Sequence, residues 1–121
     1  MASQEKLTFP ESLRLKMSHE FKEVRETGKR KIKGCLILNW KVLPEGGESR
    51  LGVITTKKLG KAHDRSRARR LMRETFRLQQ HRLKASILVL IARNSILSKS
   101  QPEVEKDFLL LAREAGILKT E

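Results

Sequence analysis

The chain has 121 residues, which is enough for one domain that buries about two thirds of its unfolded surface. The chain has 27 lysine and arginine residues and 14 acidic residues, which gives a formal net charge of +13. This charge indicates a polyanionic partner, such as nucleic acid or an anionic membrane. No apolar run approaches the roughly 20 residues of a membrane-spanning helix, and the start lacks a signal core, so we expect no membrane partner and a cytoplasmic location. The single cysteine, Cys35, fits a reducing compartment and is expected to be a small buried hydrophobe.

The N-terminal part of the chain predicts an arm followed by a short helix. Residues 1–11 are polar and predict a flexible arm on a single domain. On the helix that follows, Phe21 and Val24 are expected to face inward. Gly28 is expected to be the left-handed residue that ends this helix.

Three segments further along the chain predict the strands of a sheet. The β-rich run KRKIKGCLILNWKVL ends at the turn PEGGES, and RLGVITTKK follows it. The later run SILVLIARN is almost continuously apolar, which is typical of a strand covered on both faces. Between these segments lies a basic helix, so the part from residue 51 to residue 94 forms a β-α-β crossover.

The last helix has clear start and stop signals. Ser100 and Glu103 have the spacing of a capping box, and Gly116 can end the helix. The predicted fold class is therefore an α/β sandwich of the α+β kind. It has one mixed, mostly antiparallel four-stranded sheet and three helices in the order α-β-β-β-α-β-α. Its core stripe on the last helix comprises Val104, Phe108, Leu111, Ala112 and Ala115.

The basic helix, predicted from about Asp64, is the most informative feature of the chain. Apolar side chains recur along it at the spacing of a buried stripe, so the arginines must point away from the core along two flanks. Like charges stand four residues apart on these flanks, which is unfavourable without a counter-anion and indicates a phosphate backbone as the partner. The buried stripe is predicted to comprise Ala68, Leu71, Met72, Thr75 and Phe76.

Catalytic chemistry is not visible in the sequence. The acidic residues are scattered, and His19, His63 and His81 share no metal-ligand spacing, so we expect neither a catalytic residue nor a metal site in this chain. Binding of RNA is favoured over binding of duplex DNA, because the segment before the basic helix is a strand followed by KKLGKAH and not the first helix of a helix-turn-helix.

The segment RSRARRLMRETF, preceded by LGVITTKKLGKAHD and followed by ILVLIAR, resembles the bacterial ribonuclease P protein component. The F-x-x-V-x-x-x-G pattern from Phe21 to Gly28 belongs to the same resemblance, which covers residues 13–118. The resemblance implies a left-handed β-α-β crossover. It also implies an endoribonuclease subunit that binds a catalytic RNA and the 5′ leader of precursor tRNA, while Mg²⁺ bound mainly by that RNA performs the hydrolysis. No protein partner is predicted.

The resemblance also implies roles for individual positions. Arg65, Ser66, Arg69 and Arg73 would border a cleft for the leader, and Arg67 and Arg70 would contact the catalytic RNA. In the cleft, Arg25, Cys35 and Leu38 take positions that are often aromatic in the family, so leader stacking should be weaker here. The RNA-binding positions are Lys57, Lys58, Lys61, Arg65, Ser66, Arg67, Arg69, Arg70, Arg73 and Arg77, and the leader-cleft positions are Phe21, Arg25, Cys35 and Leu38.

Two other classes of protein fit a small basic chain. A ribosomal or ribosome-assembly protein would bind structured RNA without supporting turnover. A DNA-binding transcription factor would bind duplexes in a sequence-selective manner and would be expected to dimerise. Restoration of precursor tRNA cleavage by a ribonuclease P RNA distinguishes the leading interpretation from both.

Overall fold

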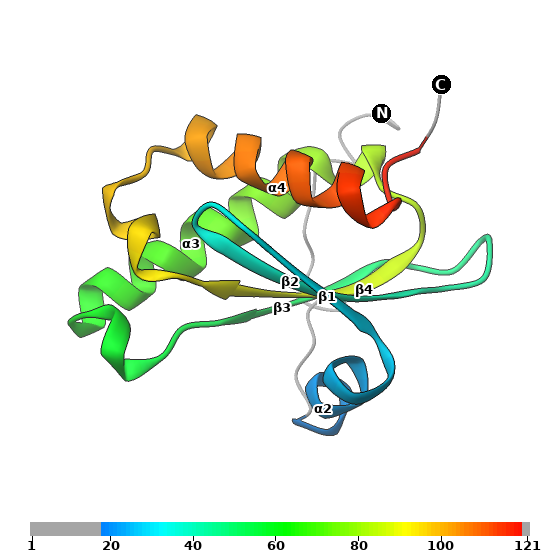
Figure 1. The fold of residues 1–121 in the computed structure, drawn as a ribbon, viewed down its shortest axis with the longest axis horizontal. Coiled ribbons are helices and arrows are strands. Elements are labelled where there is room, and N and C mark those ends of the chain that lie inside the picture. The colour runs from blue at the N-terminus through cyan, green and yellow to red at the C-terminus, as the bar shows by residue number, and fades with distance from the viewer. Residues whose placement is uncertain (1–17, 120–121) are drawn as a thin grey trace.

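A computed structural model describes residues 18–119, and the arm predicted at residues 1–11 lies outside this range. The expected order of helices and strands is confirmed (Figure 1). The helices and strands are α2 (Ser18–Thr27), β1 (Lys29–Lys33), β2 (Leu36–Val42), β3 (Arg50–Ile54), α3 (Ala62–Gln79), β4 (Ser86–Ala92) and α4 (Gln101–Ala115), with the short 3-10 helices η2 (Lys57–Leu59), η3 (Gln80–Arg82) and η4 (Asn94–Ser98) between them.

The four strands form one sheet in the order β1-β2-β4-β3. β2 is antiparallel to both β1 and β4, whereas β3 is parallel to β4, so the predicted mixed and mostly antiparallel sheet is confirmed. The parallel pair is joined through α3, which makes the predicted β-α-β crossover. The β-rich run between residues 29 and 43 folds into two strands at Gly34, whose φ of +59° is a conformation that glycine adopts without strain.

The helices cover the two faces of the sheet unequally. Figure 1 shows α3 and α4 on one face and α2 on the other. Successive side chains of a strand point to opposite faces, so Leu36, Leu38 and Trp40 of β2 face α3 and α4 and join the main core. Each large aliphatic or aromatic side chain buried there stabilises the fold by about 1.5–3 kcal/mol.

A second, smaller cluster lies under α2. Val24 is buried against Val89 of β4, and Phe21 packs at its margin, so the inward orientation of both is confirmed. Gly28 does end α2, but it is not left-handed, and that part of the prediction is wrong. A Cβ atom at Gly28 would lie 2.4 Å from the carbonyl oxygen of Trp40, so the position requires glycine because β2 approaches it closely.

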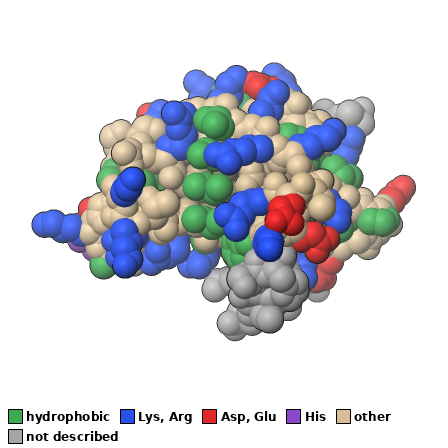
Figure 2. Space-filling view, turned by 60° about the horizontal axis from the view of Figure 1, so that its bottom comes forward, with side chains coloured by type: hydrophobic (Ala, Val, Ile, Leu, Met, Phe, Trp, Pro, Cys, Tyr) green, Lys and Arg blue, Asp and Glu red, His purple; other side chains and the backbone are tan. Residues whose placement is uncertain are grey.

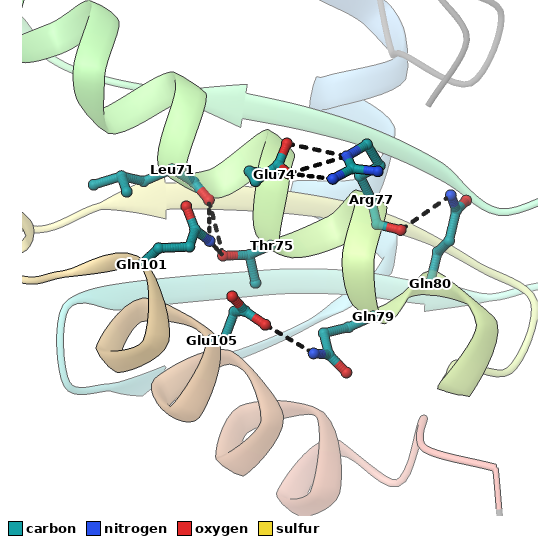
Figure 3. Close-up of polar contacts among 8 residues, drawn as sticks. All are labelled: Leu71, Glu74, Thr75, Arg77, Gln79, Gln80, Gln101 and Glu105. Carbon is teal, nitrogen blue, oxygen red and sulfur yellow. Dashed lines mark hydrogen bonds and ion pairs between the residues drawn. The ribbon is translucent and has the colours of Figure 1, made fainter. Parts of the chain in front are cut away.

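Polar contacts fix α4 against α3 (Figure 3). The buried hydroxyl of Thr75 donates to the Leu71 carbonyl at 2.8 Å and accepts from the Gln101 amide at 2.7 Å, while Gln79 donates to Glu105 at 2.9 Å. The capping box of α4 is confirmed, and Gly116 ends this helix with a φ of +75°. The orientation of α3 on the sheet is therefore set by its apolar stripe and by α4 together.

Candidate nucleic-acid interface

α3 is an amphipathic helix whose buried side matches the sequence prediction. It begins at Ala62, two positions before the predicted start, and Asp64 accepts a hydrogen bond from the backbone N–H of Lys61 at 3.1 Å. The buried stripe packs on the sheet, so the arginines lie along the flanks of the helix. All five predicted stripe residues are buried, namely Ala68, Leu71, Met72, Thr75 and Phe76.

One arginine flank of α3 lies beside the end of β3. Arg69 donates through one guanidinium nitrogen to the Thr55 hydroxyl at 2.8 Å, and Thr55 follows β3 directly. Its other terminal nitrogen donates to the Ser66 hydroxyl at 3.3 Å. Arg65 donates to the Gly60 carbonyl at 2.8 Å. These bonds hold both half-buried guanidinium groups in place, and each group keeps further N–H donors for a phosphate oxygen.

The second flank of α3 faces the connection between η4 and α4. Arg67 donates to the Lys99 carbonyl at 2.8 Å, so this side chain also links α3 to the connection that precedes α4. Arg70 is exposed. The two flanks thus present cations in different directions, which matches the predicted separation of Arg65 and Arg69 from Arg67.

The remaining predicted cations differ in their surroundings. Arg77 forms an ion pair with Glu74, and the hydrogen bond from Arg77 lowers the pKa of the Glu74 carboxyl, so the charge of Arg77 is compensated locally. Arg73 is half-buried. Lys57, Lys58 and Lys61 are all exposed in the segment that leads into α3.

The face of the sheet next to α2 carries a row of four isoleucines, one from each strand. The strand register pairs Ile32 with Ile37, Ile37 with Ile91, and Ile91 with Ile54, so the four side chains cross the sheet in a line on one face. Ile32 is 52 % exposed and the other three are partly exposed. We call this line the isoleucine row. Figure 2 shows a band of hydrophobic side chains with lysine and arginine side chains on both sides of it.

The isoleucine row is bordered by α2 along one side and by the first arginine flank of α3 at one end. Phe21 of α2 packs against the cluster that includes Ile54 and Ile91. At the β3 end, Ile54 precedes Thr55, the partner of Arg69. An apolar floor with cations at its margin is suited to a single nucleic-acid strand, because bases contact the floor and phosphates contact the cations.

The structure places two of the four predicted cleft residues elsewhere. Phe21 and Arg25 lie on α2 beside the row, with Arg25 exposed. Cys35 and Leu38 are fully buried in the main core, so their assignment to the leader cleft is wrong. The β2 residues that face α2 are Ile37, Asn39 and Lys41.

Cys35 has a structural role in that core. Its backbone N–H donates to Asp107 of α4 at 3.0 Å, and burial together with the hydrogen bond to Asp107 raises the pKa of the thiol to about 12. The thiol is therefore protonated at neutral pH and is not a nucleophile.

Sequence reasoning missed the isoleucine row and Asn39 because the strands are covered on both faces and their apolar runs do not alternate. One signal was available. Cys35 and Leu38 are three positions apart, and side chains at that spacing point to opposite faces of a regular strand. The two residues could therefore not both line a cleft on one face of the sheet. Asn39 is almost fully buried, and its Oδ1 atom has no hydrogen-bond partner within the described residues.

Two further findings concern the chemistry of the described residues. Among the side chains that the structure describes between residues 18 and 119, no three of histidine, cysteine, aspartate or glutamate lie where they could jointly hold a metal ion. Within the same range no helix has both the length and the apolar character needed to cross a bilayer.

Comparison with known proteins gives one consistent result. The family model described as Ribonuclease P matches residues 9–116. A ribonuclease P protein component from Clostridium kluyveri is 35 % identical over 109 residues, which cover 88 % of this chain and 96 % of that protein. One from Haemophilus influenzae is 44 % identical over 93 residues, or 75 % and 76 % of the two chains.

Solved structures agree with the fold. The RNase P protein from Thermotoga maritima superposes with a TM-score of 0.73 at 25 % identity, covering 84 % of this chain and 96 % of that one. The RNase P protein from Staphylococcus aureus gives a TM-score of 0.79 at 21 % identity over 88 % of this chain and 98 % of that one.

Proposed function

The chain belongs to the ribonuclease P protein family, and we propose that it joins a large catalytic RNA in the cytoplasm and helps to remove the 5′ leader of precursor tRNA. The family is that of an endoribonuclease in which the catalytic centre lies in the RNA. Magnesium ions held by that RNA supply the hydrolytic chemistry. The part of this chain is to bind and to orient the two RNA molecules.

The observation that carries the proposal is the isoleucine row with its basic margin. A single strand laid on the row contacts aliphatic side chains with its bases, while Arg65 and Arg69 are held where its phosphates would pass at the β3 end. The leader of a precursor tRNA is such a strand, and mature tRNA lacks it. The row therefore gives the chain a means to favour the substrate over the product.

The second arginine flank supports a separate contact with the catalytic RNA. Arg67 and Arg70 lie on the side of α3 away from Thr55, so they can contact a different RNA surface while the first flank holds the leader. The exposed guanidinium group of Arg70 suits this contact because its planar fork can grip two phosphate oxygens, whereas the Nη1 atom of Arg67 is buried and its Nη2 atom is bonded to the Lys99 carbonyl. A ribosomal or ribosome-assembly protein, the earlier alternative, is not favoured by the family match.

Reconstitution of cleavage tests the proposal. The chain is mixed with a bacterial ribonuclease P RNA at a magnesium concentration too low for that RNA to act alone, and precursor tRNA is added. We expect cleavage that leaves the mature 5′ end, with none from the RNA or the protein separately. Binding of the RNA without any cleavage at low magnesium would instead indicate a protein that binds structured RNA only.

A further inference from the structure

We propose that Arg25 and Arg30 form a second phosphate contact at the β1 edge of the sheet, so that the isoleucine row is a track with a basic group at each end. This inference rests on the proposed function, because it takes the leader as the strand that lies on the row. It adds a second anchoring point, which only a sufficiently long leader reaches.

The placement of the two arginines follows from the strand register and the helix spacing. Arg30 is two residues before Ile32 on β1, so both side chains lie on the same face of the sheet. Arg30 also pairs with Asn39, which is beside Ile37 on β2. Arg25 is one helical turn after Phe21 on α2, and α2 ends where β1 begins. Both cations therefore lie at the end of the row opposite Arg69.

The charge of these two arginines has no carboxylate partner among the described residues, unlike that of four lysines around them. Arg25 and Arg30 are exposed, and neither forms a hydrogen bond or an ion pair with another residue in the described range. Four of the neighbouring lysines have carboxylate partners, whereas Lys29, which directly precedes Arg30, has none among the described residues. Lys22 pairs with Glu26 at 3.9 Å, Lys41 with Glu23 at 2.9 Å, and Lys31 and Lys33 with Glu114.

The floor between the two basic ends makes phosphate contacts important. All four side chains of the isoleucine row are aliphatic, so a strand gains little stacking energy on them, and its affinity depends more on the phosphates held at the ends. Cations on an edge strand also discourage pairing with another sheet. That role alone would give no dependence on RNA length, so the experiment below separates the two.

The width of the sheet sets the expected length dependence. Four strands enclose three spacings of about 4.8 Å, so the row spans roughly 14 Å. At a rise of about 3.4 Å per stacked nucleotide, this distance corresponds to about four nucleotides. In the proposed function the second flank of α3 contacts the catalytic RNA, and the Arg69 end of the row is the end that lies beside α3. The leader therefore enters at the Arg69 end and reaches Arg25 and Arg30 last.

The test measures the affinity of the reconstituted holoenzyme for precursor tRNAs whose leaders grow from about two to about twelve nucleotides, a range that brackets typical single-strand site sizes. The double variant Arg25→Ala with Arg30→Ala should lose about tenfold, or about 1.4 kcal/mol, on long leaders and nothing on short ones. Arg69→Ala should lose affinity from leaders about four nucleotides shorter. A variant with lysine at both positions 25 and 30 should retain most of the long-leader affinity.

A matched control removes two charges on the other side of the molecule. Lys106 and Arg113 are exposed on α4, and Lys106→Ala with Arg113→Ala should leave the dependence on leader length unchanged. Equal losses in both double variants, or a loss that does not depend on leader length, would overturn the inference. If the unaltered chain supports no cleavage or shows no preference for any leader, the proposed function itself fails.

Discussion

Gly28 shows how a single residue positions the candidate cleft. The backbone N–H of Gly28 donates to the Val24 carbonyl at 2.9 Å at the end of α2. The Trp40 carbonyl oxygen occupies the space in which a Cβ atom of residue 28 would lie. This contact sets the distance between the C-terminal end of α2 and β2. Phe21 and Arg25 are carried on the same helix, so their position beside the isoleucine row depends on it.

Substitution of Gly28 tests this role. A Cβ atom would lie 2.4 Å from the Trp40 oxygen and 2.5 Å from the Val24 oxygen, and both are backbone atoms that cannot rotate away. We expect Gly28→Ala to lower the free energy of unfolding by about 1–3 kcal/mol in urea titrations. It should also weaken binding of long leaders. Glu26→Ala, an exposed change on the same helix, should stay within about 0.5 kcal/mol of the unaltered chain. Equal stability of the two variants would contradict this account.

Single residues were predictable where one face of an element is polar. All five buried residues of α3 were predicted because charged side chains occupy the rest of that helix. On β2, Cys35 and Leu38 were assigned to the wrong face because apolar residues occupy both faces, so the sequence does not reveal which of them a partner contacts.

Helix α4 holds α3 in place, and the start of α4 depends on its capping box. Ser100 and Glu103 satisfy each other's backbone N–H groups, and the bond from the Ser100 N–H lowers the pKa of the Glu103 carboxyl. A carboxyl group whose pKa is lowered by folding stabilises the protein above its unfolded pKa, and this contribution disappears as the pH falls through the folded pKa. The cap should therefore weaken in acid.

The substitution Glu103→Gln tests this dependence. At pH 7 it should lower the free energy of unfolding, because a neutral amide accepts the Ser100 N–H less strongly than a carboxylate does. The difference from the unaltered chain should shrink as the pH falls below the ordinary glutamate pKa of about 4.3 and on through the lowered pKa of folded Glu103, because the native carboxylate then becomes protonated too. Urea titrations at several pH values measure it, with Glu48→Gln in the exposed β2–β3 connection as the control. A difference that stays constant with pH would show that the charge of Glu103 has no part in the cap.

Whole elements were predicted better than their ends and their pairing. Both ends of α4 were predicted from its capping residues. The start of α3 was predicted two residues too late, because lysine, the residue type at position 61, is not one that marks an N-cap in a sequence. The predicted order of four strands requires two strands in the run between residues 29 and 43, but the sequence did not show that the turn between them lies at Gly34. The left-handed crossover remains a prediction that rests on the family resemblance, since the general preference is for right-handed connections.

The molecule as a whole separates two kinds of surface. One face of the sheet is sealed by α3 and α4 over the main core, while α2 covers only part of the other face and leaves the isoleucine row partly exposed. Because α3 begins just after β3, its first arginine flank stands at the margin of the open face. The net charge of +13 predicted a polyanionic partner, but the candidate contact site for it was found only from the strand register.

Photocrosslinking of the leader tests this arrangement most directly. A precursor tRNA that carries one 4-thiouridine in its leader is bound to the reconstituted holoenzyme and irradiated, and the crosslinked peptides are identified by mass spectrometry. We predict crosslinks to the peptides that contain Phe21, Ile37 or Ile91, which border or form the isoleucine row. Crosslinks confined to the outer side of α4, around Leu109 and Leu110, would contradict it.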